Sequence, residues 1–99
     1  MAIRHLVLLR FYAQTSAADR ESIATAFAAL PAQIDGITGF EWGTNVSPEG
    51  LAKDFTHAFT VTFRDPAARD AYLPHPAHRA FVERLKPHLA DVLVFDYAI

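Results

Sequence analysis

Residues 55–63 read Phe55-Thr56-His57-Ala58-Phe59-Thr60-Val61-Thr62-Phe63, so large side chains alternate with alanine and threonine throughout. A period of two is the spacing of side chains on a β-strand, where neighbours point to opposite faces. The large side chains therefore share one face, and the small or hydroxylated ones share the other. We expect a strand here whose first face lies in the core.

The rest of the chain also contains clear local signals for strands and helices. Residues 3–12 form a second strand-like run, in which His5, Val7 and Leu9 share one face. Helix starts are marked by Ser16, with a carboxylate three residues later, and by Asp65 followed by proline. Together the signals predict strands at residues 3–12, 40–46, 55–63 and 92–97 and helices at residues 15–34, 66–73 and 76–86.

This order is β-α-β-β-α-β, which suits a ferredoxin-like α+β fold with an antiparallel sheet and both helices on one face. The other face then needs a cover, and a chain of 99 residues has no third layer to supply it. The composition agrees, because 52% of the residues are apolar and only 20% are charged. This is more apolar surface than the core of one small domain can bury. We expect a single domain over residues 1–99 that forms a homodimer, a dimeric α+β barrel.

Charge and composition exclude several classes of partner. The net charge is −2 and no basic run is present, which argues against nucleic acid and against an anionic membrane. The chain has no cysteine, which excludes thiolate catalysis, disulfides and cysteine-type zinc sites. No apolar run reaches membrane-spanning length, and the first residues lack the layout of a signal peptide. We expect a cytoplasmic protein.

Groups that transfer protons are concentrated in Tyr72-Leu73-Pro74-His75-Pro76-Ala77-His78. The two prolines end one helix near Leu73 and begin another near Pro76, which puts His78 in a first helical turn. The positive end of the helix dipole disfavours imidazolium there, so His78 is expected to be neutral near pH 7. A neutral base beside a phenol is a usable catalytic pair.

The same residues also admit a purely structural interpretation. His75 would then cap the second helix, His78 would pack its ring against a neighbour, and Tyr72 would be an ordinary core residue. The local sequence leaves both interpretations open.

Further short motifs occur along nearly the whole chain. They are His5 in the first strand, Trp42-Gly43-Thr44-Asn45, Thr56-His57 with Val61-Thr62-Phe63, the 72–78 segment with Phe81, and Phe95-Asp96-Tyr97. Their type and order resemble the stress-responsive A/B barrel, or Dabb, family. The resemblance implies a dimeric α+β barrel, in agreement with the fold expected from the residues.

The resemblance extends to the olivetolic acid cyclase-like polyketide cyclases of that family, which close a linear polyketide thioester by aldol condensation. It implies that His78 is the base and that Tyr72 works with it, in a pocket that also includes His5 and His57, with His75 beside them. Such a reaction needs a base to remove a proton next to a carbonyl, and a donor to stabilise the enolate or alkoxide that forms.

The resemblance also implies which apolar side chains line the pocket. Two positions depart from the family in bulk, because Phe59 replaces a smaller aliphatic residue and Leu89 stands where a larger aromatic one is expected. The implied lining residues are Val7, Leu9, Phe27, Phe59, Leu73, Phe81, Val92 and Val94.

Two functions from different classes follow. The first is a cofactor-free cyclase or lyase acting on a small apolar carbonyl, aromatic or polyketide-like compound, with oxidation of an aromatic by a cofactor-free monooxygenase as a variant. The second is a non-catalytic stress-response protein or small-molecule-binding dimer in which the histidines stabilise the fold.

Neither function calls for a cofactor. Glycine-rich phosphate loops and serine nucleophile motifs are absent from the sequence. A metal held by His75, His78 and Asp70 is a third option, but these residues lack the spacing of a known metal motif. We expect neither a cofactor nor a metal.

Overall fold

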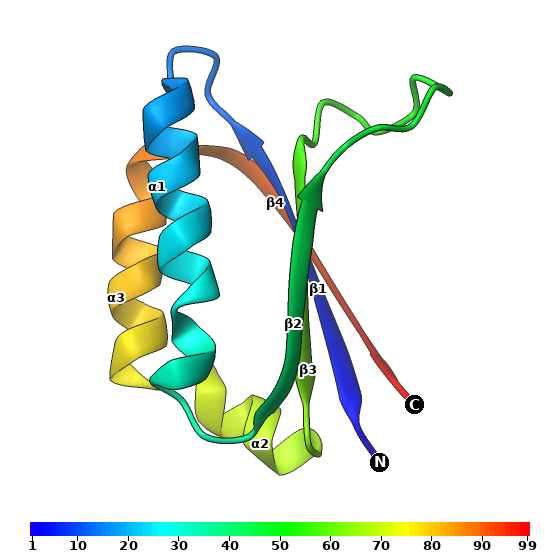
Figure 1. Cartoon of the computed structure of the whole chain (residues 1–99), viewed down its shortest axis with the longest axis vertical. Coiled ribbons are helices and arrows are strands. Elements are labelled where there is room, and N and C mark those ends of the chain that lie inside the picture. Colours follow the sequence, from blue (N-terminus) through cyan, green and yellow to red (C-terminus); the bar gives the residue numbers. More distant parts are fainter.

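The computed structural model describes residues 1–99 and contains one antiparallel sheet with helices on one of its faces (Figure 1). The strands and helices are β1 (Ile3–Phe11), α1 (Ala17–Ala28), β2 (Ile37–Thr44), β3 (His57–Phe63), α2 (Pro66–Tyr72), α3 (Pro76–Leu85) and β4 (Leu89–Ala98). Across the sheet the strands run in the order β2-β3-β1-β4, so that β1 and β3 are central. The ferredoxin-like α+β fold predicted from the order of the sequence signals is confirmed.

The strand boundaries differ from the expected ones by a few residues. β3 begins at His57 rather than at Phe55, because the backbone N–H of Phe55 bonds to the carbonyl of Ala52 within a turn. β2 covers residues 37–44 rather than 40–46, because its pairing with β3 ends where Thr44 lies opposite His57. β4 is longer than the expected 92–97, since it pairs with β1 along most of its length.

The helices end where proline interrupts their hydrogen bonds. α1 stops at Ala28 rather than near Ile34, because Pro31 has no N–H to donate, and a 3-10 turn at Leu30–Ala32 follows. α3 likewise gives way to a 3-10 turn, Lys86–His88, which contains Pro87. None of the helices has the length and apolar character needed to cross a membrane.

The core lies between the sheet and the helices. On β1 alternate side chains are buried on the helix side and half-buried on the other, as the period of two predicts. Phe59 of β3 is fully buried and stacks on Phe27 of α1, with ring centroids 4.4 Å apart. This stacked pair ties the helical layer to the centre of the sheet.

Glycine at position 36 allows α2 to pack closely against the start of β2. Gly36 has φ +94°, a left-handed conformation that glycine adopts without strain. A Cβ atom built there would lie 2.7 Å from the Cβ of Ala68 on α2. This close approach fixes the position of α2, whose last residue is Tyr72.

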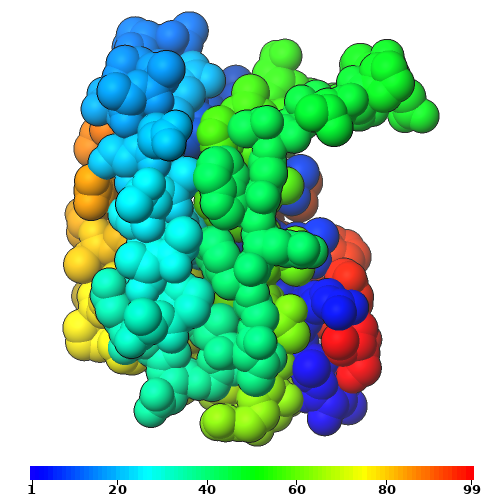
Figure 2. All heavy atoms as spheres, viewed as in Figure 1, coloured from blue at the N-terminus to red at the C-terminus, as the bar shows by residue number.

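No layer covers the outer face of the sheet (Figure 1). Its half over β1 and β4 is apolar, since Leu6 and Leu8 of β1 lie opposite Phe95 and Leu93 of β4. Phe95 is 60% exposed and Leu93 is 44% exposed. The loop of residues 45–56 stands out from the body of the molecule on this side (Figure 2). The outer face therefore leaves large apolar side chains in contact with solvent.

Candidate active site

His78 lies in the first turn of α3, directly after the break between α2 and α3. Pro74 has no N–H, so α2 cannot continue and the carbonyl of Leu73 has no helical partner. His78 Nδ1 lies 2.9 Å from this carbonyl oxygen. Because a carbonyl only accepts, this contact assigns the proton to Nδ1 and leaves a lone pair on Nε2.

Tyr72 lies against His78, with ring centroids 4.3 Å apart. It is almost completely buried, and its ring also meets Phe63 edge-on at 4.9 Å. Burial raises the pKa of Tyr72 above its usual range, because the charged phenolate is poorly solvated there. The phenol therefore keeps its proton at neutral pH and is available as a hydrogen-bond donor.

His5 faces Tyr72 from β1, at a ring-centroid distance of 5.9 Å. Its Nδ1 lies 2.6 Å from Oδ1 of Asp96 on β4, where Nδ1 donates and the carboxylate accepts. Sequence reasoning included Asp96 in a family motif but missed this contact. Alternation along β4 could have revealed it, because that period puts Asp96 on the same face as Val92 and Val94.

His5, Tyr72 and His78 line one cavity of about 250 Å³ between the sheet and the helices. Its remaining walls are apolar, and it opens beside β4, where Val92 and Val94 are 42% and 55% exposed. Six of the implied lining residues contribute to it, together with three residues outside that set, of which Leu89 was noted above for its bulk. The first group is Val7, Phe27, Leu73, Phe81, Val92 and Val94, and the second is Val82, Leu85 and Leu89.

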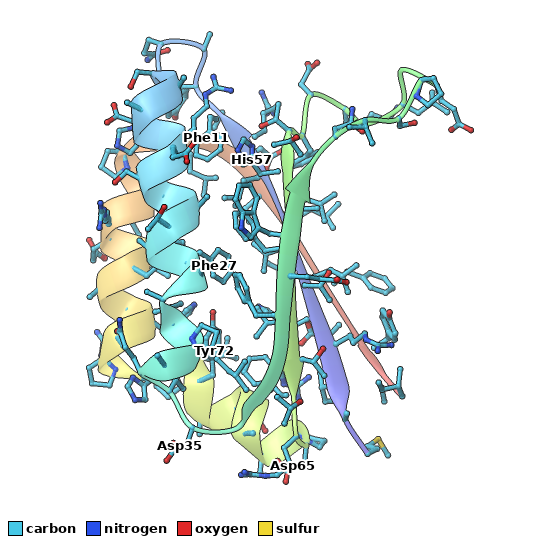
Figure 3. All side chains as sticks on the ribbon, viewed as in Figure 1. Phe11, Phe27, Asp35, His57, Asp65 and Tyr72 are labelled. Atoms are coloured by element: carbon cyan, nitrogen blue, oxygen red, sulfur yellow. The ribbon has the colours of Figure 1, made fainter.

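The structure does not bring His57 into this cavity. The register of β1 and β3 places His57 opposite Leu9 and four residues along β1 from His5, a displacement of about 13 Å at strand spacing. His57 packs against Phe11, with ring centroids 5.1 Å apart. Figure 3 shows His57 beside Phe11 at one end of the layer between helices and sheet, and Tyr72 at the other end.

Three other residues expected at the pocket also lie outside its lining. Leu9 and Phe59 are fully buried in the core. His75 is the N-cap of α3, where its Nδ1 accepts a hydrogen bond from the N–H of Ala77 at 3.0 Å. The capping role considered for His75 is thus the one that the structure shows.

The metal-site option has no support in the structure, which gathers no group of three or more His, Cys, Asp or Glu side chains able to hold one metal ion. Asp70 is paired with Arg69 at 3.1 Å, and Nδ1 of His75 is engaged by the helix cap. The remaining chemistry of the cavity is that of two imidazoles and one phenol.

Comparison with known proteins puts this arrangement in a family. The family model described as Stress Responsive A/B Barrel Domain (Dabb) matches residues 3–99. The chain belongs to the Dabb family. It is 35% identical to stress-response A/B barrel domain-containing protein HS1 of Arabidopsis thaliana, over 96% of this chain and 87% of that protein. It is 29% identical to olivetolic acid cyclase of Cannabis sativa, over 98% of this chain and 96% of the cyclase.

Two solved structures superimpose closely on this one. Hydroxynitrile lyase from Passiflora edulis matches with a TM-score of 0.92 and 27% identity, covering 99% of this chain and 93% of the lyase. A dimeric ferredoxin-like protein of unknown function from Thermobifida fusca YX matches with a TM-score of 0.84 and 30% identity, covering 100% and 92%. Since proteins of different activity share this fold, function has to be argued from the site.

The electrostatics of the site favour an uncharged His78. Burial lowers the pKa of His78; the bond to the Leu73 carbonyl opposes this, and the neighbouring His5 and His75 lower the pKa further. At neutral pH the lowered pKa favours the neutral imidazole of His78, while Tyr72 keeps its proton.

The lowered pKa values predict how stability depends on pH. Burial is the main cause of the lowered pKa of both His57 and His78, so below about pH 6.5 the unfolded chain binds more protons than the folded one. We expect the free energy of unfolding to decrease as the pH falls through this range. Urea unfolding at pH 7.5, 6.0 and 5.0 measures the decrease. In the double variant His57→Gln/His78→Gln, the free energy of unfolding should decrease less over the same pH range. An unchanged pH dependence in that variant would contradict the prediction.

Proposed function

We propose that this Dabb-family protein is a cofactor-independent enzyme that cyclises a small carbonyl compound by proton transfer. The observation that carries the proposal is the hydrogen bond from Nδ1 of His78 to the Leu73 carbonyl. It leaves the basic Nε2 on a side chain that lines an apolar cavity next to the protonated phenol of Tyr72. Base and donor are therefore together in one water-poor space.

The proposed reaction is an intramolecular aldol addition. Nε2 of His78 takes a proton from a carbon next to a carbonyl, and the electron pair of that C–H bond forms an enolate. The O–H of Tyr72 donates a hydrogen bond to the enolate oxygen. The enolate carbon then forms a bond to a second carbonyl carbon of the same molecule, whose oxygen becomes an alkoxide and takes the proton back from His78. The step needs no oxidant or reductant.

The lining of the cavity favours an uncharged, largely apolar substrate. Ten of its residues are hydrophobic or aromatic, and no lysine or arginine lines it. A carboxylate or phosphate buried there would lack a counter-charge. The volume of about 250 Å³ lies just below the usual range of about 300–1,000 Å³ for ligand pockets, so the part of the substrate that enters is small.

The proposed assembly is a homodimer that covers the outer face of the sheet. An uncovered apolar patch on that face is formed by Leu6, Leu8, Leu93 and Phe95. A second copy of the same face would be complementary to it. The relative from Thermobifida fusca, described as dimeric, supports this assembly.

Binding of a neutral dicarbonyl compound tests the proposed substrate class. We expect a linear 1,5-diketone with an alkyl chain, whose intramolecular aldol reaction closes a six-membered ring, to raise the melting temperature of the wild-type protein by several degrees. Its carboxylate analogue, matched in length, should give a much smaller shift, because the cavity offers no counter-charge. Equal shifts from both compounds, or none from either, would contradict the proposed substrate class. Formation of the cyclic product, followed by chromatography, then separates an enzyme from a non-catalytic binder.

A further inference from the structure

A groove of about 300 Å³ lies along α3 next to the cavity. Leu73, His78 and Val82 line both spaces, so the groove begins where these side chains border the cavity. The lining of the cavity contains no lysine, arginine or carboxylate, whereas the other walls of the groove are charged. Those walls are formed by Arg79, Glu83 and Lys86.

Helix geometry explains why these side chains share one groove. His78, Val82 and Lys86 follow each other at intervals of four residues, so they lie on one side of α3 and of the turn that continues it. Arg79 and Glu83 form the neighbouring row at the same interval. The groove therefore extends from the candidate base His78 toward the C-terminal end of α3.

Arg79 is the free positive charge in this groove. Nζ of Lys86 donates to Oε1 of Glu83 at 2.9 Å, so these two charges neutralise each other. Among the arginines, only Arg4 and Arg79 make no hydrogen bond or ion pair through the side chain. Arg4 alternates with the inward-facing His5 on β1 and belongs to the outer face of the sheet.

We propose that Arg79 binds a carboxylate at the outer end of the substrate, which is therefore an oxo acid whose apolar end enters the cavity. This inference rests on the proposed function and names its substrate class more closely. The fork of N–H donors on a guanidinium matches the two oxygens of a carboxylate. Arg79 is exposed, so an anion reaches it without losing all of its water.

The two ends of such a substrate are not interchangeable. Phe27, Phe81 and Leu85 are buried walls of the cavity, and a carboxylate among them would have no counter-charge. A carboxylate on the groove side has Arg79. Because His78 lines both spaces, the reacting carbons lie between the apolar chain and the carboxylate.

The charge of the groove fits a carboxylate better than a phosphate. Arg79, Glu83 and Lys86 together leave one net positive charge, which a carboxylate balances. A phosphate monoester carries nearly two negative charges at neutral pH. Its second charge would remain unbalanced and would lie beside the carboxylate of Glu83.

Three matched probes test the proposal by binding alone. Each is a 1,5-diketone with an alkyl chain at one end. The first bears a carboxylate on a short spacer at the other end, the second bears a primary amide there, and the third carries the carboxylate at the tip of the alkyl chain instead. At about 20 mM salt, calorimetry should show the outer acid binding wild-type protein roughly threefold to fivefold more tightly than the amide, the range of an exposed ion pair.

The position of the charge and the ionic strength give two further checks on wild-type protein. The third probe should bind more weakly than the amide, because it would bury its carboxylate among apolar side chains. The preference for the outer acid over the amide should shrink at 300 mM salt, where exposed charges are screened. Both checks work without any variant.

Variants of Arg79 should remove or invert the preference. In Arg79→Met the outer acid and the amide should bind equally, and in Arg79→Glu the amide should bind more tightly than the acid. Arg84→Met is the matched control, because Arg84 is an exposed arginine of the same helix whose side chain contacts Ser22 on α1, away from the groove. It should keep the wild-type preference.

The results separate this inference from the proposed function. If the amide binds but the outer acid binds no better, or if Arg79→Met keeps the full preference, the role of Arg79 is wrong while the proposed function stands. A preference lost in Lys86→Met and kept in Arg79→Met would also overturn it. If none of the probes binds the wild-type protein, the proposed substrate class fails and this inference fails with it.

Discussion

Replacing His78 by alanine should reduce turnover of the dicarbonyl probe by roughly a thousandfold, the usual contribution of a general base. The variant loses the nitrogen that accepts the substrate proton, and no other base in the cavity lies as close to Tyr72. Because His78 is only half-buried and lies in the first turn of α3, the fold should survive. Steady-state kinetics and circular dichroism on the same sample measure both effects.

Two further variants separate a chemical role of His78 from a structural one. His78→Gln has an amide that can still donate to the Leu73 carbonyl, but it has no basic nitrogen, so it should be as inactive as the alanine variant. His75→Asn is the matched control from the same segment, because asparagine also caps helices and His75 does not line the cavity. Normal rates in His78→Gln, or an equal loss in His75→Asn, would remove His78 from the mechanism.

Phe95→Asp should convert the proposed dimer into a monomer. Phe95 lies on the uncovered outer face, on the edge strand β4, opposite Leu6 in the β1–β4 register. Two-fold symmetry would place two new carboxylates in one apolar interface, where each costs several kcal/mol if it is unpaired. Sedimentation velocity at micromolar concentration should show a wild-type dimer of twice the mass of the 11.0 kDa chain and a monomeric variant.

A matched control adds the same charge on the opposite side of the molecule. Ala18 is exposed in the first turn of α1, where a carboxylate is favourable. Ala18→Asp should therefore remain dimeric. A monomeric wild-type protein, or a Phe95→Asp variant that sediments as the wild type does, would show that the outer face is not the interface.

The elements were predictable because their signals are local. The alternation of residues 55–63 and of residues 3–11 depends only on the period of a strand, and the break between α2 and α3 depends only on the missing N–H groups of Pro74 and Pro76. Local geometry also places Tyr72 and His78 close together, because they flank that break. Boundaries shifted where pairing or a turn competed with the local preference, as at Phe55 and Thr56.

The residues that form the site were less predictable, because they depend on the register between paired strands. His5 and His57 both lie on the helix-facing side of the sheet, but the pairing of Leu9 with His57 separates them along the strands. The side chain of Phe59 points to the face of the sheet on which the pocket lies, but it stacks on Phe27 in the core. A period of two assigns a face to each side chain, whereas only the register gives its position along that face.

For this protein, the amino-acid sequence by itself determined the order of strands and helices, their buried faces, the apolar outer face and the proximity of Tyr72 to His78. These features arise from interactions within a few residues of each other. Only the tertiary structure decided that His5 lines the same cavity as that pair and that His57 does not. It also decided that Asp96 hydrogen-bonds to both His5 and Arg69. Those contacts join β1, β4 and α2, elements far apart in the sequence, and they form only when the sheet register and the helix packing bring them together.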